Sequence, residues 1–458
     1  RFICAIMQIH NIVNHLLSMM ERIFAKVFTI TILFIDRMVN FTEIFETRKN
    51  DSRWNTSYPL SPDDWNIYRV PEELSFSEEE ELSFYIHIPF CKKLCSFCEY
   101  TRMLCPSVKL QDQYVDTLKH DVFTFIEKYP SIKLCGLDVG GGTPTAVSHK
   151  SFENLMSLCS SAMSTLTISD SFTPSIEATF ETLTAQKVDL LTSAGFKRVS
   201  LGIQSTSSEV LSCNHRDSSD LEYMKKSISM LHDKGVCIVN LDMMYGLKGQ
   251  SIGSFRKDMQ TLKYLQPEQV TIYELRTNMI NEQVHMSKDE LYDAYSFLYH
   301  SLLDLGYHAR FGQNTFSKSS NDIGVSSYLR ERMMNAGSYK GFGISAQSMS
   351  RNGISYNVGK LKTSFKDLLE SKTFAEEYVY HLPPEELAAK YIAIGAYNGS
   401  FSLKRLSELL GCDARTYYSG QLDFCLSRGY IEIFDDRVAV TPSGFKYYGA
   451  LFSLFYST

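Results

Sequence analysis

Short apolar runs alternate with longer amphipathic segments from about residue 83 onward. The short runs are rich in β-branched residues and have the length of strands, whereas the longer segments have helical periodicity. The pattern predicts strands over residues 83–88, 134–139, 175–179, 198–203, 236–243 and 269–274. It predicts helices over residues 109–128, 151–164, 184–193, 220–234 and 251–265. Strands that alternate with helices indicate βαβ units and a parallel sheet.

The positions of polar, glycine and cysteine residues distinguish a β/α barrel from a doubly wound sheet. These residues lie at or near the downstream ends of the expected strands: Cys91, Gly140 to Gly142, Glu177, Gln204, Asp242 and Glu274. A barrel gathers the carboxyl ends of its strands into one mouth, whereas a doubly wound sheet has a single crevice. We therefore expect an α/β protein whose residues 83–310 form a partial (β/α)6 TIM-like barrel.

The C-terminal part of the chain has a different pattern. Residues 384–396, 402–410 and 414–428 predict three helices, and residues 429–440 predict a two-stranded wing that turns at Asp435-Asp436. A further helix begins near Thr441, so residues 383–458 are expected to form an all-α, winged-helix-like domain. From Phe401 onward there are six Lys or Arg and six Asp or Glu residues, and DNA binding needs a basic face. A structural cap or substrate cover is the preferred interpretation, and residues 311–382 are expected to be an extension that covers the barrel.

Residues 1–82 are expected to be an N-terminal extension that is partly disordered. Its apolar run from Ile23 to Ile35 contains Lys26 and falls short of the roughly 20 residues that span a membrane. Small-residue cleavage sites typical of signal peptides do not follow it. The chain also begins with Arg1, and we interpret this segment as a mis-started or truncated gene model or an amphipathic leader rather than a stable membrane anchor. Trp54 and Trp65 are expected to pack below the barrel or over its site.

Composition narrows the functional classes. A net charge of -6 gives no reason to expect a nucleic-acid partner. Eleven cysteines spread over 458 residues do not suit a disulfide framework, which is typical of small secreted chains. We therefore expect a cytoplasmic protein with a metal or catalytic site.

Three cysteines form the strongest local motif. Cys91, Cys95 and Cys98 have the spacing C-x3-C-x2-C directly after the first expected strand. Electron-transfer clusters use four cysteines, so three would leave one iron open to a chelating ligand, as a catalytic zinc keeps a position open. The alternatives are buried structural cysteines, or a structural zinc site with Cys105 as fourth ligand. Structural zinc sites usually use two close pairs of ligands, which disfavours the zinc alternative.

Several further motifs occur in order with the triad. His87-Ile88-Pro89-Phe90 leads into it, and the others are Gly140-Gly141-Gly142-Thr143-Pro144, Leu201-Gly202-Ile203-Gln204-Ser205 and Asn240-Leu241-Asp242-Met243-Met244-Tyr245-Gly246-Leu247. Together they resemble the radical S-adenosylmethionine (SAM) superfamily, in the branch of oxygen-independent coproporphyrinogen III oxidase and its heme-chaperone-like relatives. The resemblance covers roughly residues 83–280 and extends more loosely into the C-terminal domain.

The resemblance implies one [4Fe-4S] cluster per chain, held by the three cysteines and by the amino and carboxylate groups of SAM. It also implies that SAM or the cluster lies against a set of further residues: Tyr85, His87, Phe97, Gly141, Gly142, Thr143, Glu177, Gln204, Arg216 and Asp242. The residues themselves leave simpler roles open. The glycines could form a tight turn, Arg216 and Asp242 a salt bridge in the barrel floor, and the aromatic residues ordinary core.

The implied activity is that of a radical SAM oxidoreductase, similar to coproporphyrinogen dehydrogenase, which cleaves SAM reductively to a 5′-deoxyadenosyl radical. The implied partners are a small-molecule substrate, in this branch a tetrapyrrole of porphyrin and heme metabolism, and an electron donor such as flavodoxin or ferredoxin. No catalytic residue is assigned.

The chain departs from its family in two places. Glu99-Tyr100 stands where the oxidase has glycine and cysteine, and Leu329-Arg330 stands where the heme chaperones have His-Asn, although Tyr339 to Gly343 keeps the Tyr-x-Gly-x-Gly pattern. The alternatives are therefore a heme-binding chaperone with little radical turnover and a radical methyltransferase that uses two SAM molecules. A second SAM or a heme is a further candidate ligand.

Overall fold

The computed structural model describes residues 40–50, 58–59, 62–276, 285–359, 365–370, 373–375 and 378–456. The expectations for the apolar run from Ile23 to Ile35 and for Trp54 lie outside the described residues. Within the described ranges, no helix has both the length and the apolar composition that crossing a bilayer requires.

A large mixed sheet forms the centre of the molecule, and six of its parallel strands follow one another in chain order. They are β2 (Glu81–Ile88), β5 (Lys133–Gly141), β7 (Ser175–Ala178), β8 (Arg198–Gln204), β9 (Ile238–Tyr245) and β10 (Gln269–Glu274). Each pairs in parallel with the next. These are the six predicted strands, so the expected α/β architecture is confirmed.

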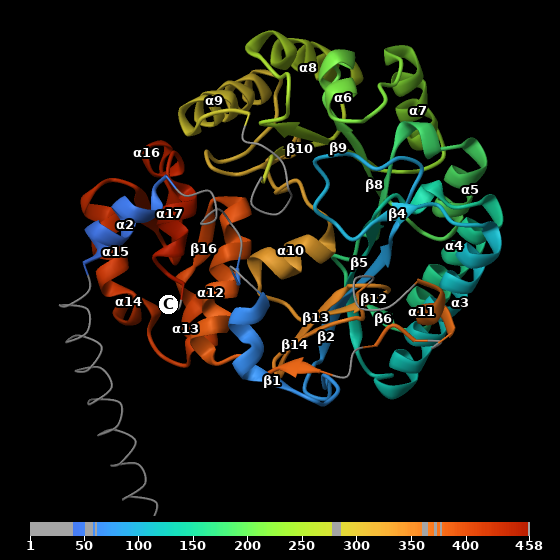
Figure 1. The fold of residues 1–458 in the computed structure, drawn as a ribbon, viewed down its shortest axis with the longest axis horizontal. Coiled ribbons are helices and arrows are strands. Elements are labelled where there is room, and N and C mark those ends of the chain that lie inside the picture. Colours follow the sequence, from blue (N-terminus) through green and yellow to red (C-terminus); the bar gives the residue numbers. More distant parts are fainter. Residues whose placement is uncertain are drawn as a thin grey trace, which may run out of the picture.

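The helices between these strands cover the outer face of the sheet (Figure 1). They are α3 (Val108–Lys128), α4 (His149–Thr165), α5 (Ala185–Ser193), α6 (Ser208–Cys213), α7 (Leu221–Asp233) and α8 (Ile252–Leu265). All but the short α6 were predicted. Four of them begin where a side-chain oxygen accepts a hydrogen bond from a first-turn backbone N–H: Ser148, Thr184, Asp220 and Ser251. Such caps satisfy backbone donors that have no partner within the helix, and they fix where each helix starts.

Further strands extend the sheet at both ends and leave it open. Beside β2 lie β12 (Tyr339–Phe342), β13 (Gln347–Ser350), β14 (Gly353–Tyr356), β15 (Val379–Tyr380) and β1 (Arg69–Val70), and beside β10 lies β11 (Thr315–Ser317). Among the described strands, no pairing joins β1 to β11, so the predicted barrel is partial. The sequence did not reveal these strands, which have only two to four residues and lie outside the regular alternation of strands and helices.

One helix lies on the inner face of the sheet. In Figure 1, α10 (Ser327–Met334) crosses the centre of the molecule, and it packs against β5 and β2. Gly136 on β5 permits this close approach, since a Cβ there would lie only 2.5 Å from the Tyr328 nitrogen. The longer α9 (Lys288–Asp304) follows the parallel strands and packs against α8.

The C-terminal part contains the predicted wing together with additional elements. Its elements are α12 (Pro384–Gly395), β16 (Ser400–Ser402), α13 (Leu403–Leu410), α14 (Ala414–Tyr417), α15 (Ser419–Ser427), β17 (Ile431–Phe434), β18 (Arg437–Val440), α16 (Pro442–Phe445) and α17 (Tyr448–Ser453). The helix predicted over residues 414–428 is divided at Tyr418, whose backbone is not helical. The wing turns at Asp435 as expected, and β16 adds a third strand to it.

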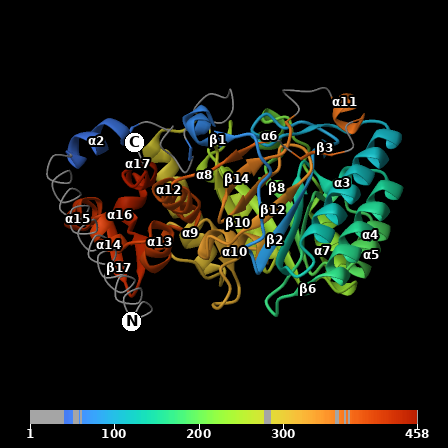
Figure 2. The same ribbon diagram turned by 90° about the horizontal axis from the view of Figure 1, so that it is seen from below.

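The N-terminal extension packs against this C-terminal part. Figure 2 shows α2 (Phe41–Arg48) beside α15 and α17, and Phe45 stacks on Tyr430 with ring centroids 5.4 Å apart. Trp65 is buried between Tyr380 and α12, where its indole N–H donates to Glu386 at 3.0 Å. Segments from opposite ends of the chain therefore stabilise each other.

Candidate functional site

The three cysteines lie on one short loop at the carboxyl end of β2. Cys91 ends β3 (Phe90–Cys91), which pairs with β4 (Met103–Leu104), so the loop that carries Cys95 and Cys98 is closed at its base. Within the loop, the Cys98 N–H donates to the Cys95 carbonyl at 3.4 Å. Burial, with smaller effects of Cys98 and Cys95, raises the pKa of Cys91 to about 11. A metal ligand must be a thiolate, so metal binding here would release a proton.

Two arginines hold the cysteine loop. Arg102 donates to the carbonyls of Cys95 and Cys98, at 2.6 and 3.4 Å. Arg216 donates to the Cys95 sulfur at 3.5 Å and also to the carbonyl of Gly202 on β8. These contacts fix the position of the loop that carries Cys95 and Cys98.

The donor set fits an iron–sulfur cluster better than a single metal ion. Within the described part of the chain, no three His, Cys, Asp or Glu side chains converge as a single ion would require. Such convergence is not needed for a [4Fe-4S] cluster, because each cysteine binds a different iron. Cys105, the fourth ligand of the zinc alternative, directs its thiol to the Ala146 carbonyl at 3.7 Å.

The glycine-rich turn after β5 lies directly against the cysteine loop. The Gly141 N–H donates to Glu177 at 3.1 Å, and a Cβ on Gly140 would lie 2.6 Å from the same carboxylate. Gly142 packs against the Phe90 backbone, and the Thr143 hydroxyl lies 3.9 Å from the Cys91 sulfur. The turn is therefore glycine-rich because protein groups approach it closely. Gly140 also lies against the Glu177 carboxylate, although only its two neighbours were among the predicted glycines of the site.

His87 and Tyr85 form a neutral hydrogen-bonded pair on β2. Burial lowers the pKa of His87 to about 4, so the imidazole is uncharged at neutral pH. Its Nε2 lies 2.8 Å from the Thr101 carbonyl and must carry the hydrogen. Nδ1 is then free to accept from the Tyr85 hydroxyl at 3.3 Å. His87 thus ties the end of the cysteine loop to the strand beneath it.

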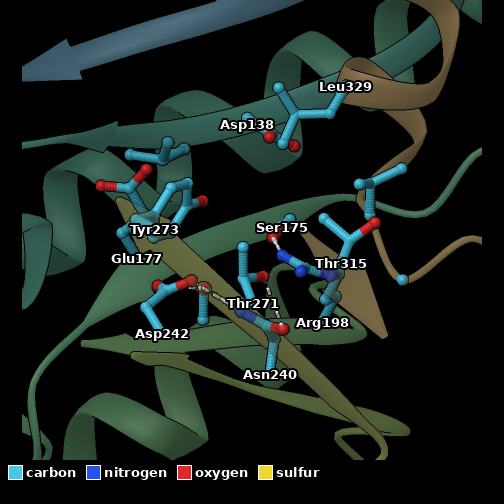
Figure 3. A pocket seen from close by; sticks show the side chains of 14 residues that line it. Asp138, Ser175, Glu177, Arg198, Asn240, Asp242, Thr271, Tyr273, Thr315 and Leu329 are labelled. Atoms are coloured by element: carbon cyan, nitrogen blue, oxygen red, sulfur yellow. Dashed lines mark hydrogen bonds between the residues drawn. The ribbon is translucent and has the colours of Figure 1, made fainter. Parts of the chain in front are cut away.

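Polar side chains on neighbouring strands surround a small cavity under this mouth. The cavity has a volume of about 50 Å³. In Figure 3, Glu177, Asp242 and Asp138 lie around it, with Arg198 on the opposite side. Glu177 lines this hollow and keeps exposed surface at the end of β7. Burial, and then the neighbouring Asp242, raises the pKa of Glu177 to about 7, and burial raises that of Asp138 to about 7. Carboxyl groups outnumber cations here, which favours a positively charged ligand or bound protons.

Asp242 also belongs to a network within the sheet. It accepts hydrogen bonds from Ser200 at 2.7 Å and from Asn240 at 2.9 Å. Arg198, rather than Arg216, is the cation of this cavity, and it donates to Ser175 and Gln269 at 2.9 and 2.8 Å. The sequence left open a salt bridge between Asp242 and Arg216 as a simpler role. Both residues are described in the structure, and neither bonds to the other.

Gln204 adopts a left-handed backbone conformation, with φ of 62°, at a bulge where β8 ends. Such a conformation is uncommon for a residue other than glycine and is often found at functional sites. Asp258 on α8 holds the following turn, accepting from the Thr206 N–H at 2.6 Å and from Ser205 at 3.2 Å. Sequence reasoning missed Asp258, although an aspartate on the apolar face of a predicted helix was a usable signal.

Phe97 packs in a small hydrophobic cluster with Val210, Leu247 and Leu275. It therefore excludes water from one side of the cysteine loop. Beside it, Glu99 forms an ion pair with Arg276, which follows β10, and both side chains are largely buried. This pair was not predicted, because its partners are far apart in the sequence.

The parallel strands, with the three-cysteine loop at the end of the first of them, agree with the resemblance of the sequence motifs to the radical SAM superfamily. Residues 85–262 match the model of that superfamily, so the chain contains a radical SAM domain. The superfamily implies a [4Fe-4S] cluster and SAM.

The chain is also similar to named proteins of one branch of this superfamily. The chain is 25% identical over 372 residues to a heme chaperone HemW of Bacillus subtilis, covering 79% of this chain and 96% of that protein. It is 26% identical over 334 residues to an oxygen-independent coproporphyrinogen III oxidase of Salmonella typhimurium, covering 69% and 72%. Among solved structures, coproporphyrinogen III oxidase (HemN) from Escherichia coli, described as a radical SAM enzyme, has the same fold. Its TM-score is 0.68, with 22% identity and coverage of 82% of this chain and 90% of that one.

Proposed function

We propose that Cys91, Cys95 and Cys98 hold one [4Fe-4S] cluster and that SAM binds to its open iron. The observation that carries the proposal is the contact of the cysteine loop with the glycine-rich turn and Arg216, all at the carboxyl end of the parallel strands. When bound, the cluster and SAM supply a one-electron reductive cleavage that yields a 5′-deoxyadenosyl radical. The protein supplies orientation and exclusion of water.

The chain's own residues have distinct parts in this proposal. Arg102 and Arg216 offset the charge of the thiolates, and neutral His87 anchors the loop without adding charge. Glu177 and Asp242 face the hollow with carboxylates that suit the cationic groups of SAM. Gln204, Gly141 and Gly142 shape the wall of the SAM site. A second cluster motif is absent from the sequence, so an external donor such as flavodoxin or ferredoxin is proposed.

We further propose that the substrate or ligand is a tetrapyrrole, as the names of the relatives suggest. A heme chaperone with little radical turnover is the second candidate. It is favoured by the match over 96% of HemW against 72% of the oxidase. The Tyr-x-Gly-x-Gly segment does not distinguish the oxidase from the chaperone, because its structural role already accounts for its glycines. Most of it forms β12, which pairs with β2. A Cβ on Gly343 would lie 2.6 Å from the His87 carbonyl.

Anaerobic reconstitution with iron and sulfide tests the proposal. We expect protein-bound iron and formation of 5′-deoxyadenosine from SAM under dithionite. Cys95→Ala should abolish both, whereas Cys237→Ala, at an exposed cysteine away from the loop, should change neither. Heme binding without 5′-deoxyadenosine would favour the chaperone, and bound zinc in place of iron would refute the cluster itself.

A further inference from the structure

Five tyrosines lead from the candidate SAM site to the surface of the protein. They are Tyr85 on β2, Tyr328 on α10, Tyr339 on β12, Tyr356 on β14 and Tyr380 on β15. Tyr85 lies at the site end, since its phenol contacts His87 and lies in the field of Glu177. Tyr380 is half-buried at the other end.

Consecutive members of this tyrosine series are in contact. The rings of Tyr85 and Tyr328 stack with centroids 5.6 Å apart, and Tyr328 meets Tyr339 edge to face at 5.8 Å. Tyr339 donates to Gln347, whose side-chain amide donates to the Tyr356 hydroxyl at 2.6 Å. Tyr356 and Tyr380 meet edge to face at 6.1 Å. One hydrogen-bonded bridge and three ring contacts therefore join the site to the surface.

Packing alone does not explain why these rings carry hydroxyl groups. Burying a phenol is costly unless its hydroxyl finds a partner, and phenylalanine would fill nearly the same volume. The chain uses phenylalanine on the opposite face of β2, where Phe84 packs with Phe125 and Phe342. The two faces of one strand thus differ: the outer face meets phenylalanines and the inner face meets tyrosines. A phenol can lose its O–H hydrogen atom at moderate energetic cost, whereas a phenylalanine ring has no hydrogen atom that is lost as easily.

We propose that this tyrosine series carries oxidising equivalents away from the site when the 5′-deoxyadenosyl radical forms but does not react with substrate. The inference rests on the proposed function, which supplies the oxidant. Tyr85 gives its phenolic hydrogen atom to the 5′-deoxyadenosyl radical, so an O–H bond breaks and the stronger C–H bond of 5′-deoxyadenosine forms. Each phenoxyl radical then takes one electron and one proton from the next tyrosine, until Tyr380 holds the unpaired electron. A thiol in solution restores Tyr380 by giving up its own hydrogen atom.

Arg332 supports the middle of the series. It donates to the Tyr328 hydroxyl at 3.3 Å and to Gln347 at 3.3 Å, and its guanidinium lies 4.8 Å from the centre of the Tyr339 ring. Its charge also stabilises negative charge on a phenol oxygen at the moment when a proton leaves. The rings of Tyr328 and Tyr339 are thereby held beside a fixed positive charge.

A radical trap at the surface end tests the proposal. Tyr380→3-aminotyrosine introduces a more easily oxidised ring, and the same replacement at exposed Tyr264, outside the series, is the matched control. The reconstituted cluster is photoreduced, the reductant is removed, SAM is added without substrate, and the sample is frozen for EPR. 5′-Deoxyadenosine is measured in the same samples.

We expect an aminotyrosyl signal with the trap at position 380 and little with the trap at position 264. Adding Tyr328→Phe, which keeps the ring but removes the phenol, should lower the signal at least about tenfold while 5′-deoxyadenosine formation and iron content stay unchanged. If 5′-deoxyadenosine forms without a signal at position 380, or if Tyr328→Phe leaves that signal intact, the series does not conduct. If no 5′-deoxyadenosine forms, the proposed function fails and this inference fails with it.

Discussion

The guanidinium of Arg216 bridges the sulfur of Cys95 and the carbonyl of Gly202, so it joins the cysteine loop to the end of β8. This contact gives Arg216 a role that does not require SAM. It holds a prospective thiolate ligand next to a fixed positive charge, at the point where β8 bends into its bulge.

Arg216→Met should therefore loosen the cluster. A hydrogen bond to a charged group contributes roughly 1.5–3 kcal/mol, which corresponds to about a tenfold to hundredfold faster loss of iron to a chelator. Arg216→Lys should give an intermediate rate, because it keeps the charge but not the two-pronged geometry. Iron release followed by absorbance measures this. Equal rates in all three proteins would show that Arg216 does not support the loop.

Gly142→Ala should distort the site because the added Cβ would lie only 2.8 Å from the Phe90 carbonyl oxygen, a backbone atom that cannot easily move. We expect a loss of about 1–3 kcal/mol in the free energy of unfolding and weaker SAM binding. Gly253→Ala in α8 is the matched control, since its Cβ would make an ordinary contact of 3.5 Å with Ser251. The control should be neutral or slightly stabilising, as expected for alanine in a helix. Urea unfolding and calorimetric SAM titration supply the two readouts, and similar results for both variants would contradict the account of the turn.

Asp258→Ala should disturb Gln204 from a distance. Loss of the carboxylate leaves the Thr206 N–H and the Ser205 hydroxyl without their buried acceptor, at a cost of about 1–3 kcal/mol each. Asp258→Asn retains one acceptor and should cost less. We expect SAM affinity to fall in the same order as stability, measured by titration. An unchanged SAM affinity in Asp258→Ala would separate this turn from the SAM site.

Lys390 should make stability depend on pH. Burial, with smaller effects of Arg332 and Arg276, lowers its pKa from 10.5 to about 7, and its amine donates to the Tyr58 carbonyl at 2.9 Å. Between about pH 7 and 10.5 the folded protein holds this lysine neutral while the unfolded chain holds it protonated. Unfolding then takes up a proton, so stability rises with pH in this window, and below pH 7 the full penalty of the buried charge is present.

Lys390→Met removes that dependence. Its stability advantage over the natural chain should be largest near pH 6 and should shrink by up to about 1.4 kcal/mol per pH unit above pH 7. Urea unfolding of both proteins at pH 6, 7, 8 and 9 measures the difference. A difference that stays constant across this range would mean that Lys390 keeps its charge in the folded state.

Much of the fold could be predicted from sequence, and the reason is physical. Five of the six parallel strands and the long helices contain enough residues for a period to appear, four-residue β7 is placed by the predicted helices on either side of it, and capping residues mark several helix starts. The strands from β11 to β16 are too short for that. Tyr418, which divides a predicted helix, carries no local signal for its backbone conformation.

The candidate site likewise has a part that the sequence predicts and a part that it does not reveal. Spacing alone predicted that the three cysteines share one loop, and the order of motifs predicted that Glu177 and Asp242 belong to the same site. Two of the supporting contacts join distant parts of the chain: Asp258 with the turn after β8, and Glu99 with Arg276. Such pairs become visible only when the strands are assembled side by side.

EPR spectroscopy of the reduced, anaerobically reconstituted protein tests the central claim most directly. If three cysteines leave one iron open to SAM, the spectrum of a [4Fe-4S] cluster should be present and should change when SAM is added. S-adenosylhomocysteine serves as the control ligand, and Cys98→Ala should lose the spectrum altogether. A cluster spectrum that SAM leaves unaltered, or a protein that binds no cluster, would contradict the account.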